Sequence, residues 1–131
     1  MGGSLLVGIS AVAQNEKQQP REQMIGSIQG PALYKAYCAV CHGPEGRGNG
    51  PMAKTLKIAP TDLTRIASHS GGKFPRMKIE GIILGEDVPA SHGVREMPLW
   101  GPVFSEVGDD QDLGRVRVDN LARFIEGMQG K

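Results

Sequence analysis

Residues 38–42 carry the most distinctive combination of reactive side chains in the chain. Cys38 and Cys41 are separated by two residues, and His42 follows the second thiol directly. Thiols at this spacing can add across the two vinyl groups on one edge of a porphyrin. The next residue then lies under the ring, where its imidazole can bind the iron. The spacing therefore predicts covalent attachment of one c-type haem, with His42 as an axial ligand.

Three other uses of the thiols fit the sequence less well than haem attachment. A zinc site needs about four ligands, but the chain offers two cysteines and three histidines, His42, His69 and His92. A thioredoxin-like dithiol belongs in a βαβ pattern, which the sequence lacks. A disulfide across two residues would be strained and would close almost no loop. Haem attachment explains the pattern better than any of these.

The composition favours a small domain with many loops. The chain has 131 residues, of which 39% are hydrophobic and 5% aromatic, with 19 glycines and 9 prolines. A buried macrocycle would supply the apolar mass that so few aromatic side chains cannot. The formal net charge of +1 gives no reason to expect nucleic acid as a partner. Two cysteines also exclude a disulfide framework.

The N-terminal stretch differs from the rest of the chain. Residues 1–13 hold a short apolar run that ends in a small-x-small pattern, which is typical of signal-peptide cleavage. No Lys or Arg precedes the run, so we expect a signal segment whose basic start is missing, with a disordered N-terminus as the alternative. The run is shorter than the about 20 apolar residues of a membrane span. Residues 14–29 predict a flexible lead-in, and residues 30–131 form the expected domain.

The domain sequence predicts short helices and no strand. A first helix is expected from Gly30–Pro31 through the attachment motif to Gly43–Pro44, with Leu33, Tyr37 and Val40 on one face. The glycine-rich residues 43–51 predict a turning loop in which glycines allow close approach to a flat ring.

Further helices are expected downstream. The patterns predict helices from residues 61–62 to about Ala67 and from Pro75 to Gly85, then one helical turn over residues 103–107. A last helix is expected to be capped by Asp119. Its apolar stripe consists of Leu121, Phe124, Ile125 and Met128.

A six-coordinate iron needs a second ligand from the opposite face of the ring. Met97 is favoured, because it follows a long polar loop and Pro98 holds its backbone extended. Met77 and Met128 lie on helical patterns, where methionine usually fills a core. A thioether favours ferrous iron and raises the reduction potential relative to a second imidazole, which suits an electron carrier. The other candidates are Met24, Met52, His69 and His92. Among all the candidates, Met77 and His92 are the main alternatives to Met97.

From about Gly30 to the C-terminus, the sequence resembles the class I mono-haem cytochrome c family. Gly30 and Tyr34 stand eight and four residues before Cys38, where the family has a small residue and an aromatic. Leu121 and Phe124 look like the partners that these residues meet in the family. The resemblance implies an all-α, small cytochrome c fold, in which short helices wrap around one haem and the terminal helices cross.

Two further motifs carry this resemblance. Gly50–Pro51 is similar to the family's Gly-Pro, whose proline carbonyl accepts the Nδ1 proton of the axial histidine and orients it. Met97–Pro98 with Trp100–Gly101 resembles the bacterial Met-Pro-x-Trp-Gly loop, in which the tryptophan packs near the haem. The loop before Pro51 is shorter than in mitochondrial forms, and their dense lysine patch is absent. The resemblance implies a haem site made of Cys38, Cys41, His42, Met97, Pro51 and Trp100, with His42 and Met97 on the iron.

Charged residues are unevenly distributed along the domain. Basic residues outnumber acidic ones seven to three between Glu45 and Glu80, whereas acidic residues dominate seven to one between Glu86 and Asp112. Such runs are usually solvated faces. The functional alternative is a dipole that steers the encounter with a redox partner.

The leading hypothesis is an exported, periplasmic electron carrier and not an enzyme. It would bind one haem c and pass single electrons between redox-partner proteins of a respiratory-type chain, either as a monomer or as a subunit of a complex. One alternative is a haem enzyme or gas-ligand sensor with a labile sixth iron ligand. Another is a metal-binding or interaction module that uses Cys38 and Cys41 as thiolates.

Overall fold

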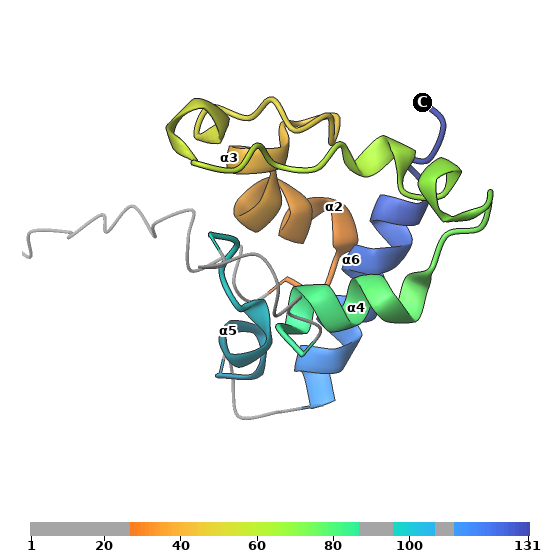
Figure 1. Cartoon of the computed structure of the whole chain (residues 1–131). Coiled ribbons are helices and arrows are strands. Elements are labelled where there is room, and N and C mark those ends of the chain that lie inside the picture. Colours follow the sequence, from red (N-terminus) through yellow and green to blue (C-terminus); the bar gives the residue numbers. More distant parts are fainter. Residues whose placement is uncertain (1–26, 87–95, 107–111) are drawn as a thin grey trace, which may run out of the picture.

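The computed structural model describes residues 27–86, 96–106 and 112–131, and the regular elements within these ranges are all helical (Figure 1). The expected all-α fold class is confirmed. The first helical run consists of α2 (Gly30–Leu33), a π-helical turn η1 (Tyr34–Cys38) and α3 (Ala39–His42). Three single 3-10 turns follow, η2 (Ala53–Thr55), η3 (Leu63–Arg65) and η4 (Ser68–Ser70), and then the longer helices α4 (Arg76–Leu84), α5 (Trp100–Glu106) and α6 (Asp112–Glu126).

Helix α6 is the element against which the other helices pack. It contacts α2, α4 and α5, and Figure 1 shows α4 lying across it with α2 close by. The predicted apolar stripe is confirmed, because Leu121, Ile125 and Met128 are buried and Phe124 packs against the same core. Helix α6 also contributes Val118, and the core is completed from the other helices and the loop before α4 by Leu33, Tyr34, Cys38, Phe74, Ile83 and Phe104.

Gly30 lies where α2 crosses α6. A Cβ atom at this position would overlap the carbonyl oxygen of Asn120 and would lie 2.9 Å from the Cβ of Phe124. Next to this contact, the rings of Tyr34 and Phe124 pack with their centroids 5.3 Å apart. The crossing of the terminal helices that the resemblance implied is therefore confirmed, and it depends on the absence of a side chain at Gly30.

Helix α6 begins at Asp112, so the prediction that Asp119 caps it is wrong. Asp119 lies inside the helix and accepts a hydrogen bond from Arg123 Nε at 2.8 Å. The apolar pattern that would mark the start of this helix is interrupted before Asp119, because two buried positions there are occupied by residues without an apolar side chain. Gly114 packs its backbone against Ser105 and the Phe104 carbonyl, and Arg117 is buried.

Two other predicted elements have different lengths in the structure. The predicted helix start at residues 61–62 is confirmed, because Asp62 caps η3 by accepting from Thr64 N at 2.9 Å and from Thr64 Oγ1 at 2.6 Å. The predicted length is wrong, because this helical turn ends at Arg65 and not at Ala67. Residues 103–106 of the expected turn belong to a longer helix, α5, with Pro102 in its tolerant first turn, and Val107 lies outside the described residues. The helix after Pro75 is confirmed as α4 and ends at Gly85 in a left-handed conformation.

Arg117 connects three parts of the fold from a buried position. Its side chain is only 2% exposed. Its Nε donates to the Ser27 carbonyl at 3.1 Å, and its Nη1 donates to the Phe104 carbonyl at 2.9 Å. Arg117 thereby holds the segment before α2 and the end of α5 against α6.

Replacing Arg117 by Met should lower the free energy of unfolding by about 2–4 kcal/mol, because part-buried carbonyl oxygens lose their charged donor. Urea unfolding followed by circular dichroism measures this loss. Arg115→Met is the matched control, because Arg115 is exposed on the same helix; it should change stability by less than about 0.5 kcal/mol. Equal unfolding midpoints for the two variants would contradict the role given to Arg117.

Candidate functional site

The two thiols and His42 lie at the end of the first helical run. The prediction of one helix from Gly30 through the attachment motif is confirmed, with a π-helical turn over Tyr34–Cys38 inside it. This wider turn shifts the register, so the predicted shared face is wrong at its far end: Leu33 is fully buried, but Val40 is 45% exposed. Cys38 is buried, whereas Cys41 and His42 are partly exposed.

The Cys38 thiol is poorly suited to work as a thiolate. Burial and, to a lesser extent, the neighbouring Cys41 raise the pKa of Cys38 to about 12. A buried thiol with a raised pKa is a weak nucleophile and a weak metal ligand. Within the described ranges, no three His, Cys, Asp or Glu side chains come together as a metal-binding group. The geometry around Cys38 thus gives no support to a redox dithiol or a zinc site.

His42 is oriented by a backbone carbonyl. Its Nδ1 lies 2.9 Å from the carbonyl oxygen of Thr61. A carbonyl can only accept, so Nδ1 carries the proton in this bond and Nε2 keeps its lone pair. Burial lowers the pKa of His42, although the bond to Thr61 acts in the opposite direction. The imidazole is therefore neutral at neutral pH and presents Nε2 as a metal ligand.

The prediction that Pro51 supplies this carbonyl is wrong. Gly50 N donates to the Cys41 carbonyl and Met52 N donates to the Val40 carbonyl, both at 2.9 Å. These bonds hold the exposed Pro51 along the end of α3, and the later segment that contains Thr61 reaches the imidazole instead. Sequence analysis missed Thr61 because Pro60–Thr61 marked only the start of a turn.

Gly48 allows the Thr61 segment to come close. Its φ is +79°, and a Cβ atom there would overlap the Pro60 carbonyl oxygen. At this position the close approach is to another backbone segment rather than to a flat ring. A hydrogen bond from Leu63 N to the Gly46 carbonyl, 2.6 Å long, continues the same contact between the two segments.

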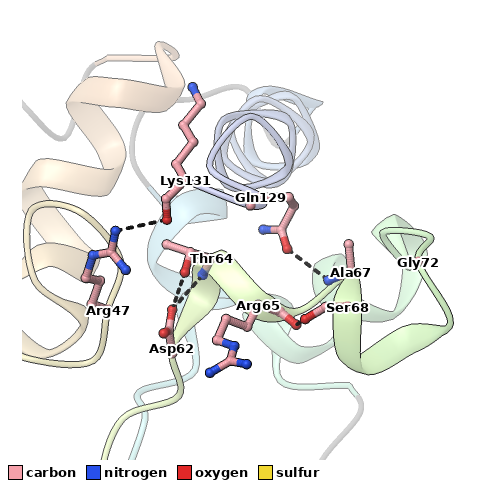
Figure 2. A pocket seen from close by; sticks show the side chains of 10 residues that line it. Arg47, Asp62, Thr64, Arg65, Ala67, Ser68, Gly72, Gln129 and Lys131 are labelled. Atoms are coloured by element: carbon pink, nitrogen blue, oxygen red, sulfur yellow. Dashed lines mark hydrogen bonds between the residues drawn. The ribbon is translucent and has the colours of Figure 1, made fainter.

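Residues after α6 hold the Thr61 segment from its other side (Figure 2). Gln129 donates to the Leu63 carbonyl at 2.6 Å and accepts from Ala67 N at 2.9 Å. Gly130 N donates to the Thr64 carbonyl at 2.9 Å. Figure 2 also shows Arg47 reaching the Lys131 carbonyl, at 2.9 Å. The orientation of His42 therefore depends on contacts from Gln129 to Leu63 and Ala67, which span 66 and 62 residues of the sequence.

Met97 and Trp100 lie next to the core cluster. Both side chains are half-buried and pack against it. The Trp100 ring lies 5.1 Å from the Tyr37 ring and 6.1 Å from the Phe104 ring, measured between centroids. Tyr37 directly precedes Cys38, so Trp100 connects the Met97 segment to the helix of the attachment motif.

Glu96 is a second residue that sequence analysis missed. Its carboxylate accepts hydrogen bonds from the backbone N–H groups of Ile58 and Lys57, and these bonds hold the pKa of Glu96 below its usual value. A charged residue directly before Met97 was the only signal in the sequence, and it did not identify the partner. The contact places the start of the Met97 segment against residues 57–58.

The other methionines and histidines have different positions. Met128 is buried, as expected of core packing, but the same expectation for Met77 is wrong because its side chain is 86% exposed. Met52 is 45% exposed, and His69 is exposed on η4. Met24 and His92 lie outside the described residues, as do the predicted signal segment over residues 1–13 and most of the lead-in over residues 14–29.

Two members of the basic region are engaged within the fold. Arg76 forms ion pairs with Glu126 and, at 3.9 Å, with Asp119 on α6. Arg47 pairs with Glu45 at 3.5 Å besides its bond to Lys131. These two arginines therefore have structural roles, and the expected charge dipole remains a prediction for the rest of the region. Over the three described ranges, no helix combines the length and apolar character needed to cross a bilayer.

Comparison with known proteins gives one finding. The family model of cytochrome c oxidase, cbb3-type, subunit III matches residues 28–81, which is less than half of the chain. Neither the curated proteins nor the solved structures yield a match. The matched segment contains the attachment motif and Thr61, but not Met97 or α6. A cytochrome c domain implies covalently bound haem and electron transfer. The match to this family model and the helical Cys38–His42 arrangement agree, and together they support a c-type cytochrome.

Proposed function

We propose that the chain is a mono-haem c-type cytochrome that carries single electrons between redox-partner proteins. Cys38 and Cys41 would hold haem c covalently, and His42 and Met97 would bind its iron. When bound, the haem supplies an iron that alternates between ferric and ferrous states. The observation that carries the proposal is the hydrogen bond from His42 Nδ1 to Thr61, next to two thiols on the same helical run.

The residues around this site would support electron transfer by orienting the ligands and packing around the haem, and they would not react themselves. Thr61 keeps the imidazole in one tautomer and orientation, which limits rearrangement when the iron changes charge. The aromatic rings of Tyr37, Trp100 and Phe104 pack together beside the attachment helix and would shield that side of a bound haem from water. With His42 and Met97 both on the iron, no coordination position remains for a substrate. This arrangement favours a carrier over a haem enzyme or a gas sensor.

The cellular setting is also part of the proposal. The matched family is described as a subunit of a cbb3-type oxidase, which supports a role within an electron-transfer complex. We propose export to the periplasm and work in a respiratory-type chain, because cytochrome c domains are typically exported or membrane-associated.

The assignment of Met97 can be tested with a matched pair of methionine variants. Met97→Ala should abolish the sulfur-to-iron charge-transfer band of the ferric protein and allow the ferrous protein to bind carbon monoxide. Met77→Ala should leave both properties unchanged, because Met77 is 86% exposed. Visible spectra with and without carbon monoxide measure these effects. A Met97→Ala protein that keeps the band would show that another residue is the ligand.

A further inference from the structure

Glu96 joins two loops directly beside Met97. Its Oε1 accepts a hydrogen bond from Lys57 N at 3.0 Å, and its Oε2 accepts one from Ile58 N at 2.9 Å. Bonds from N–H groups to a carboxylate are roughly twice as strong as neutral ones, and two of them fix its orientation as well as its position. Glu96 thereby connects residues that are 39 and 38 positions apart in the sequence.

The loop that Glu96 contacts is tied at both ends to the attachment motif. We call residues 52–61 the strap. At its first end, Met52 N donates to the carbonyl of Val40, which lies between the two cysteines. At its other end, the Thr61 carbonyl accepts from His42. Glu96 contacts the strap near its middle, so one side chain connects the Met97 segment to the backbone that orients His42.

Met97 is also restrained on its C-terminal side. Pro98 restricts the backbone of Met97. Leu99 packs against the end of α4, where a Cβ atom on Gly85 would lie 3.3 Å from the Leu99 Cβ. Trp100 then begins α5 and contacts Tyr37. On the N-terminal side of Met97, the carboxylate of Glu96 provides the corresponding anchor.

We propose that Glu96 is a positioning residue that keeps Met97 on the iron by fastening the Met97 segment to the strap. This inference rests on the proposed ligation of the iron by Met97. Without the carboxylate, the Met97 segment would lose this contact with the strap, and the Met97 thioether would hold the iron less firmly. An external ligand then competes for the same coordination position with greater success.

The test is a titration of the ferric holoprotein with imidazole, followed by loss of the sulfur-to-iron charge-transfer band. Glu96→Ala should increase the apparent affinity for imidazole by on the order of tenfold, the size of a typical coupling between two sites. Glu96→Gln keeps the size of the side chain and should have an intermediate effect, because an amide offers one acceptor oxygen instead of two.

Two control variants distinguish this role from a general effect of charge. Glu86→Gln removes a carboxylate from an exposed position after α4. Lys57→Gln removes the ammonium group beside Glu96 but keeps the amide that Glu96 binds. Both should leave the affinity for imidazole unchanged. Amide hydrogen exchange should become faster at Lys57 and Ile58 in Glu96→Ala, whereas a merely structural role would accelerate exchange throughout the domain.

The possible outcomes separate this inference from the proposed function. If the native protein shows the band and Glu96→Ala binds imidazole with native affinity, the positioning role is wrong while ligation by Met97 stands. A native protein without the band would overturn ligation by Met97 and the positioning role together. A Glu96→Ala protein that does not fold is replaced by Glu96→Gln, for which an unchanged affinity and unchanged exchange at Lys57 and Ile58 would also reject the role.

Discussion

The double variant Cys38→Ala, Cys41→Ala is expected to carry no covalently attached haem. Each thiol would form one thioether to the ring, so the native chain should keep its haem after extraction with acidified acetone. The double variant should release all of it, because His42 and Met97 would hold the iron only through reversible coordinate bonds. The mass of the intact chain and the pyridine haemochrome spectrum before and after extraction measure the difference.

The single variants serve as controls for this experiment. Cys38→Ala and Cys41→Ala each keep one thiol and should form one covalent bond to haem. The mass of the haem should stay on the chain, and the haemochrome band should shift towards that of a haem with free vinyl groups. Cys38→Ala should also lower the free energy of unfolding more than Cys41→Ala, since Cys38 is buried and Cys41 is partly exposed. A native chain whose haem is fully extracted, or that binds none when attachment machinery is present, would reject the proposed cofactor.

Gly30→Val is expected to cause a large loss of stability, comparable with that expected for Arg117→Met. A side chain at this position would overlap the Asn120 carbonyl oxygen and would also press on Phe124, whose Cβ would lie 2.9 Å from the new Cβ. The first obstacle is backbone inside α6, which cannot move without disturbing the helix. Overpacking of this kind typically costs 1–3 kcal/mol and sometimes more, so we expect a loss of about 3 kcal/mol.

Gly127→Ala is the matched control for Gly30→Val. Gly127 is exposed just after α6, and a Cβ atom there would lie 3.3 Å from the Phe124 carbonyl oxygen and 3.7 Å from that of Arg123. These are carbonyls of the preceding helical turn, so we expect a change of less than about 0.5 kcal/mol. Urea unfolding of both variants gives the comparison. Similar unfolding midpoints would show that the contact between α2 and α6 tolerates a side chain.

The parts of the fold that sequence analysis predicted correctly are those determined by local patterns. The helical run through Cys38–His42, helix α4 after Pro75 and the stripe of Leu121 and Ile125 on α6 each follow from spacing within one element. Met77 shows what local spacing does not determine. Its position on α4 was identified correctly, but the pattern did not show that its side chain points to solvent.

The features that the sequence did not predict depend on contacts between distant residues. Thr61 reaches His42 because the Gly48–Pro60 contact and the residues after α6 place it there. The start of α6 was missed because Arg117 and Gly114 occupy buried positions, and their partners are Phe104 and Ser105 in another helix. Glu96 was missed for the same reason, since its partners lie 38 and 39 residues earlier.

The most direct test of the proposed function is the visible spectrum of the native chain, expressed with haem-attachment machinery and recorded oxidised, reduced, and reduced with carbon monoxide. A c-type spectrum with the ferric sulfur-to-iron charge-transfer band, unchanged by carbon monoxide, is the expected result. It would establish that His42 and a methionine close both faces of the iron, as an electron carrier requires. A c-type spectrum that shifts with carbon monoxide would contradict the closed site, and would instead favour catalysis or gas sensing at an open sixth position.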